Sequence, residues 1–206
     1  MNTFRFLALG ASALLLAACA PQMVHTTADF ERFKPHSVLV LPPENTTPNT
    51  EVMEKSYPFI FSQLAQRGYY AISPELAMQL FEANKLNDPG RLNKLPTAKF
   101  NEVFGVDAVL RTRVTEWSSK YVVVSSSVNV GYDMELLDAK TGTLLWKNSQ
   151  VLSQAPNNGG GGGVLGALVN AAVHAAATPY EPVAQQNAMN MLNTIPQGTV
   201  GEVTKP

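Results

Sequence analysis

The first half of the chain combines strand-like and helix-like spacing of hydrophobic residues. An uninterrupted apolar run at residues 37–43 ends in two prolines and predicts a strand buried on both faces. After a loop-like polar stretch, apolar residues recur at helical spacing up to Gly68, and Pro58 leaves the start of this helix undecided. A short strand at 69–73, a helix at 74–86 and a shorter helix at 96–104 are expected to follow.

The second half changes to the period of two that strands show. Residues 108–117 place apolar side chains on one face and charged ones on the other, and residues 128–136 alternate in the same way. Residues 138–142 carry a hairpin signal, and residues 143–152 return as the partner strand. Three antiparallel strands after a strand–helix–strand–helix unit predict an α+β fold, with helices packed on one face of a mixed sheet.

The chain begins with a short apolar segment that ends in its single cysteine. Residues 6–18 are too few to span a membrane but match the apolar core of a secretory signal, with Arg5 before them. The ending Leu-Ala-Ala-Cys looks like the lipobox of bacterial lipoproteins, which makes Cys19 the predicted site of lipidation. An ordinary signal peptide that ends near a cysteine is the alternative. The residue after the cysteine is Ala20, and not the Asp that in enteric bacteria resembles an inner-membrane retention signal. We therefore expect anchoring in an outer membrane, on its periplasmic or surface side.

These boundaries divide the chain into a short series of segments. We expect a signal peptide at residues 1–18, a lipidated cysteine and short tether at 19–36, one α+β domain at 37–195 with a glycine-rich loop at 157–163, and a flexible tail at 196–206. Loss of Arg5 with the signal leaves 15 − 1 = 14 basic against 16 acidic residues. Without a basic run, nucleic acid is excluded as a partner, and membrane contact has to come from the lipid.

A helix rich in alanine is predicted after the glycine run. Gly163, Ala167, Ala171 and Ala175 recur every four residues, so they share one helix face where another backbone could approach closely. This face could serve self-association between subunits, or the helix could be buried against its own sheet. The glycine run lacks the residues of a phosphate-binding loop, and no cofactor is expected.

The histidines and serines do not form a predicted catalytic or metal site. His25, His36 and His174 have no partner at metal-ligand spacing, and residues 125–127 lack the turn of a serine hydrolase. Asp133 could form a carboxylate pair with its neighbour two residues on.

That carboxylate pair is Asp133 and Glu135, on one face of a predicted strand. A solvated sheet face is the favoured interpretation, with Arg111 and Arg113 opposite the two acids on the next strand. The sequence therefore predicts no catalytic residue.

The lipobox, the Val-Leu-Val-Leu-Pro-Pro strand and the hairpin at residues 136–146 together resemble a family of bacterial lipoproteins that includes a neisserial surface-antigen vaccine candidate. The domain is more distantly similar to the N-terminal domain of TolB, to CsgG and to LpoB-type activators. The resemblance implies an α+β domain used for protein contacts in the cell envelope, with a CsgG-like lipoprotein as a partner. The alternative is a regulator that activates a peptidoglycan synthase, although the tether at residues 19–36 is shorter than the linker of LpoB-type activators.

Overall fold

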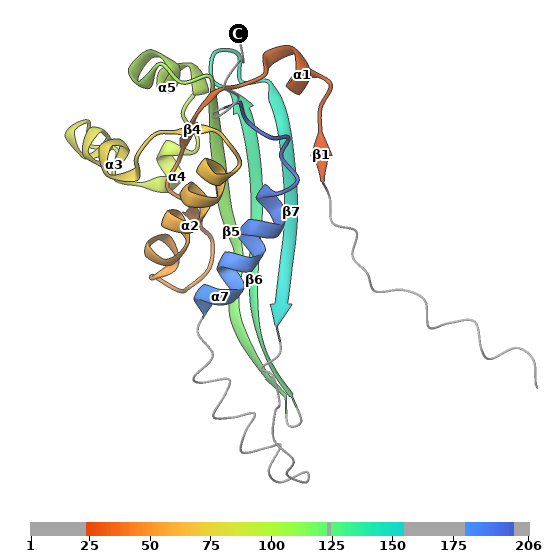
Figure 1. Cartoon of the computed structure of the whole chain (residues 1–206). Helices are drawn as coiled ribbons and strands as arrows, with labels where there is room; N and C mark the ends of the chain where they lie inside the picture. The colour runs from red at the N-terminus through yellow and green to blue at the C-terminus, as the bar shows by residue number, and fades with distance from the viewer. Residues whose placement is uncertain (1–23, 123–124, 155–179, 200–206) are drawn as a thin grey trace, which may run out of the picture.

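The computed structural model describes residues 24–122, 125–154 and 180–199. In these residues seven strands form one mixed sheet in the order β1-β7-β6-β5-β2-β4, and β3 pairs with β5 (Figure 1). The strands are β1 (His25–Thr26), β2 (Ser37–Val40), β3 (Glu44–Asn45), β4 (Tyr70–Ala71), β5 (Ala108–Val122), β6 (Ser125–Asp138) and β7 (Leu144–Gln154). The helices are α1 (Asp29–Phe33), α2 (Val52–Gln66), α3 (Pro74–Ala83), α4 (Pro89–Leu92), α5 (Thr97–Phe104) and α7 (Tyr180–Leu192).

The two halves of the sheet pair differently. β2 pairs in parallel with β4 and β5, and β3 also pairs in parallel with β5. β5, β6 and β7 are antiparallel. The turn between β6 and β7 is fixed by the Asp138 carboxylate, which accepts a hydrogen bond of 2.7 Å from the Thr141 backbone N–H, and by Gly142 at φ +75°. The predicted α+β class, the three antiparallel strands and the hairpin are confirmed.

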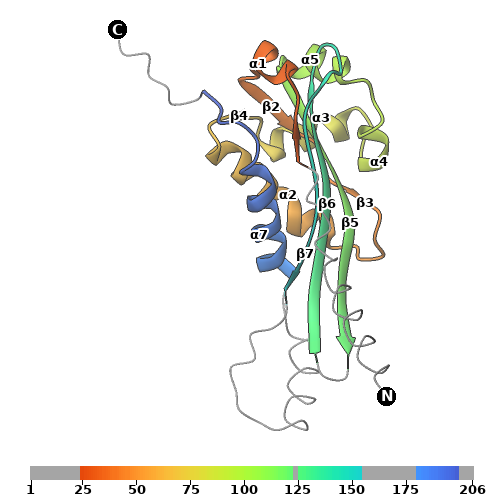
Figure 2. The same ribbon diagram turned by 90° about the vertical axis from the view of Figure 1, so that its right-hand side faces the viewer.

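The core has two parts because β2 is buried on both faces. Val38 and Val40 point to one face and join a large cluster that includes the apolar sides of α2 and α7. Leu39 and Leu41 point to the other face and join a smaller cluster under α3, α4 and α5. The edge-on view shows α2 and α7 on one side of the strands and α4 on the other (Figure 2). The predicted helix-covered face of the sheet is the one under α2 and α7. The opposite face, which the sequence does not predict to carry helices, is partly covered by α3, α4 and α5.

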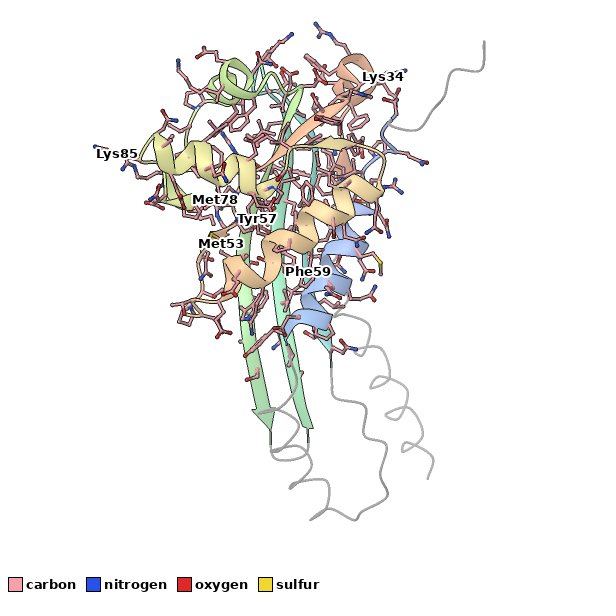
Figure 3. All side chains as sticks on the ribbon, turned by 60° about the vertical axis from the view of Figure 1, so that its left-hand side comes forward. Lys34, Met53, Tyr57, Phe59, Met78 and Lys85 are labelled. Atoms are coloured by element: carbon pink, nitrogen blue, oxygen red, sulfur yellow. The ribbon has the colours of Figure 1, made fainter. Side chains whose placement is uncertain are left out.

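Helix α2 is attached to the sheet by an apolar stripe and a buried hydroxyl. The Tyr57 hydroxyl donates a hydrogen bond of 2.9 Å to the Val40 carbonyl, while Met53 lies on the solvent side (Figure 3). The helix starts at Val52, before Pro58, so the proline lies inside it. Proline lacks a backbone N–H and so leaves one helical carbonyl without its donor. Pro58 is on the exposed side of the helix, where water can take the place of that donor.

The ends of the domain differ from the sequence prediction. Residues 25–36, expected to belong to the tether, contain β1 and α1, and Phe30 is buried in the large cluster. Of the expected flexible tail, residues 196–199 contact the domain: the Tyr69 hydroxyl donates a bond of 2.7 Å to the Pro196 carbonyl, and the Gly198 N–H donates one of 2.8 Å to the Arg67 carbonyl. Both segments gain structure from distant partners, which local sequence patterns do not reveal.

Candidate functional site

The exposed face of the three long strands carries charged residues in regular rows. We call it the charged face, and define it by Arg111, Arg113, Asp133, Glu135 and Lys147. Strand register sets Glu135 between Arg111 and Lys147 in one row, and Asp133 opposite Arg113 in the next. Their apolar neighbours in sequence point to the face that α2 and α7 cover. The predicted opposition of the arginines and the acids is therefore present in the register.

A depression of about 390 Å³ lies over the charged face. Its floor is the sheet, and its wall comes from β3 and the residues after α4, which lie beside β5 (Figure 2). The Asn93 amide donates bonds of 3.1 Å and 2.8 Å to the carbonyls of Pro42 and Pro89, which ties that wall together. The lining residues are Glu44, Asn93, Lys94, Arg111, Thr112, Arg113, Asp133, Met134, Glu135, Lys147, Asn148 and Ser149.

The two arginines are held by different partners. Arg113 Nε lies 3.2 Å from Glu44 Oε2, in a pair whose arginine side chain is 55% exposed. Arg111 Nη2 donates a bond of 2.6 Å to the Leu95 carbonyl, and its Nε is buried without a hydrogen-bond partner. Burial lowers the pKa of the Arg111 guanidinium, and the nearby Glu135 carboxylate acts in the opposite direction. The predicted partners of the arginines are their cross-strand neighbours, but the short ion pair of Arg113 is with Glu44.

This arrangement suits polar recognition. On the charged face, the basic residues of β5 and β7 lie on either side of the acidic residues of β6. The charges therefore compensate one another without forming a strongly basic or acidic patch. Ser149 donates a hydrogen bond to Asp133, but none of the described lining residues is a histidine that could act as its base. In the described part of the chain, no group of three or more His, Cys, Asp or Glu side chains is placed to hold a metal ion.

The sequence-predicted sites fall in different places. Cys19 lies outside the described residues, as does the candidate association face formed by Gly163, Ala167, Ala171 and Ala175, together with His174. His25 is exposed on β1, and His36 Nδ1 lies 2.7 Å from Thr199 Oγ1. Within the residues that the structure describes, no helix is both long and apolar enough to cross a membrane.

Sequence reasoning missed three charged lining residues and one structural carboxylate. Glu44 lies in the polar stretch that the sequence predicts as a loop, and neither Lys94 nor Lys147 carries a sequence signal of its own. Asp107 Oδ2 accepts bonds of 3.1 Å and 2.9 Å from the backbone N–H groups of His36 and Ser37, and a further 2.9 Å bond from the Ser37 hydroxyl. Burial alone would raise the pKa of Asp107, but these hydrogen bonds outweigh it and keep that pKa below its ordinary value. The only sequence signal was an acid directly before a strand.

Comparison with known families identifies the group of proteins to which the chain is related. The family model described as "Putative lipoprotein GNA1162-like" matches residues 25–199. The chain belongs to this family. It is also 33% identical over 176 residues to a lipoprotein of Neisseria meningitidis serogroup B, "Putative lipoprotein NMB1124/NMB1162", a match covering 83% of this chain and 80% of that protein. The predicted resemblance to a neisserial lipoprotein family is confirmed.

Two solved structures share the fold. Lipoprotein GNA1162 from Neisseria meningitidis superposes with a TM-score of 0.58 at 30% identity, and the match covers 70% of this chain and all of that one. A PelC dodecamer from Paraburkholderia phytofirmans superposes with a TM-score of 0.55 at 16% identity, covering 86% of this chain and 99% of the PelC chain. The likeness to PelC is one of fold alone.

Proposed function

We propose that this GNA1162-like lipoprotein is a non-catalytic assembly component of the cell envelope, anchored through lipid on Cys19 to the outer membrane. It contacts other proteins through the charged face. The partner is another copy of this chain or a CsgG-like lipoprotein that serves envelope secretion or transport. The observation that carries this proposal is the charged face, an ordered sheet surface of compensated charges that the described helices leave open. Such a surface gives specificity of contact more than raw affinity.

Two further findings support the proposal. The family to which the chain belongs is one of lipoproteins, in agreement with the lipobox that ends at Cys19. PelC, which shares the fold, was solved as a dodecamer, so this architecture is compatible with self-association. The CsgG-like partner rests on the family resemblance of the sequence.

Charge reversal on the charged face tests the proposal. In protein that begins at Ala20, Arg113→Glu with Lys147→Glu should break the balance of the rows and lower the mass of the assembly measured by light scattering. The matched control is Lys99→Glu on α5, whose side chain is 63% exposed and outside the depression. Binding of a purified CsgG-like lipoprotein should fall in the double variant and stay close to that of the wild type in Lys99→Glu. An assembly mass and partner binding that the double variant leaves unchanged, or a wild type that binds neither itself nor this partner, would contradict the proposal.

A further inference from the structure

The folded domain starts a very short distance after the lipidated residue. Six residue steps separate Cys19 from His25, the first residue of β1. Because a fully extended chain spans at most about 3.3–3.6 Å per residue, His25 lies within about 20 Å of Cys19. This inference rests on the lipid anchor of the proposed function and concerns what that anchor does to the position of the domain.

The first described residues are attached to the edge of the sheet. His25 pairs with Lys147 of β7, and the Thr27 hydroxyl donates bonds of 2.9 Å and 3.1 Å to the carbonyls of Leu144 and Leu145. Phe30 of α1 is buried in the large cluster. Figure 1 shows β1 and α1 beside β7, on the opposite side of the molecule from α3. The short connection therefore constrains the whole domain, because the segment at its end is part of the fold.

The exposed chemistry of this edge matches a headgroup layer. Arg32 and Lys34 are 77% and 69% exposed at their side chains, and each pairs with an acid of the same helix, at 3.8 Å and 3.6 Å. The edge thus presents guanidinium and ammonium groups that are balanced by carboxylates. Zwitterionic lipid headgroups likewise balance a cationic ammonium with an anionic phosphate. Val24 is its exposed large apolar residue, so the edge suits contact with headgroups rather than insertion between acyl chains.

We propose that residues 24–34, which we call the anchor edge, rest against the lipid headgroups of the bilayer that holds the Cys19 lipid. The sheet then stands with its β1–β7 edge toward the membrane, and the charged face is directed sideways, where a neighbour in the same membrane can reach it. A partner of this domain must therefore lie close to the anchoring membrane, because the connection cannot carry the domain across the periplasm.

Quenching by headgroup-labelled lipid tests this orientation. Full-length lipidated protein is placed in phosphatidylcholine vesicles that contain a nitroxide-headgroup lipid, with a fluorophore on a single added cysteine; the lipidated Cys19 does not compete for the label. Arg32→Cys labels the anchor edge, and Leu76→Cys on α3, which is 51% exposed, is the matched control. We expect severalfold stronger quenching at position 32 than at 76. Equal quenching, or stronger quenching at 76, would overturn the proposal.

A linker insertion shows whether chain length sets the orientation. Twenty Gly and Ser residues between Val24 and His25 should reduce quenching at position 32 to that at 76, because the flexible segment lets the domain move away from the surface. Quenching that stays high at 32 after this insertion would contradict the role of the short connection. Flotation of the unlabelled wild type with vesicles separates the two proposals. Protein that does not float ends both, whereas floating protein with equal quenching ends only this orientation.

Discussion

The two faces of the long strands β5, β6 and β7 have opposite characters although they share one backbone. On one face Tyr132, Met134 and Trp146 are almost completely buried under α2 and α7. On the other face the charged residues line an open depression. Alternation along a strand lets neighbouring residues carry different tasks, with stability on one side and recognition on the other. Substitutions on the two faces should therefore separate the free energy of unfolding from binding.

The largest loss of stability is expected from Trp146→Ala. Trp146 is fully buried, and its Nε1 donates a bond of 3.1 Å to Thr194 Oγ1. Removal of the indole should lower the free energy of unfolding by about 3–5 kcal/mol through lost burial and a residual cavity. Denaturant unfolding followed by circular dichroism measures this. A variant as stable as the wild type would mean that the covered face is not the main core.

Asn187→Ala should have the next largest effect. The buried amide of Asn187 donates bonds of 2.8 Å to the Val130 carbonyl and 3.3 Å to the Gln150 carbonyl, joining α7 to two strands. Its removal should cost about 1–3 kcal/mol, the usual range for a lost buried polar group. Gln186→Ala on the exposed side of the same helix is the control and should change the unfolding midpoint little. Equal effects at the two positions would contradict the attachment of α7 through Asn187.

The Asp107 carboxylate should make stability depend on pH. Its pKa is lower in the folded state than in the unfolded chain, where it is about 3.9. Its ionisation therefore stabilises the fold above the unfolded pKa, and this contribution is lost as the pH falls through the lower folded pKa. Asp107→Asn should flatten the melting-temperature profile below about pH 4. Identical profiles for both proteins would contradict the role of the hydrogen bonds from His36 and Ser37.

Arg113→Gln should have the smallest effect on stability. Its ion pair with Glu44 is largely exposed, and such pairs contribute about 0–1 kcal/mol. The melting temperature should stay close to that of the wild type, while the affinity for a partner should fall. A strong loss of stability would show that the charged face is part of the core and would remove the contrast between the two faces.

The sequence predicted the faces of the long strands well because alternation is a local pattern. Residues 108–117 and 128–136 showed which side chains share a face, and the hairpin at Asp138–Gly142 fixed which strands pair. Segments that depend on distant partners were less visible. β1 and β3 have two residues each, which is too short for a periodic signal, and they become strands by pairing with β7 and β5.

The candidate site was predictable in part for the same reason. The rows of Arg111, Arg113, Asp133 and Glu135 follow from alternation and register. The wall of the depression does not, because Glu44 lies on β3 and Lys94 follows α4, and their positions depend on the packing of α4 against β3. The association face from Gly163 to Ala175 and the lipidation of Cys19 stay predictions, since these residues lie outside the described part of the chain.

The claim that the charged face is the contact surface is tested most directly by photo-crosslinking in the cell. A photoreactive phenylalanine analogue replaces Ser149, an exposed residue that lines the depression, or Val103, which is 61% exposed on α5. We expect crosslinked products, either a dimer of the chain or a complex with a CsgG-like lipoprotein, from position 149 and little product from position 103. Products from position 103 alone would contradict it.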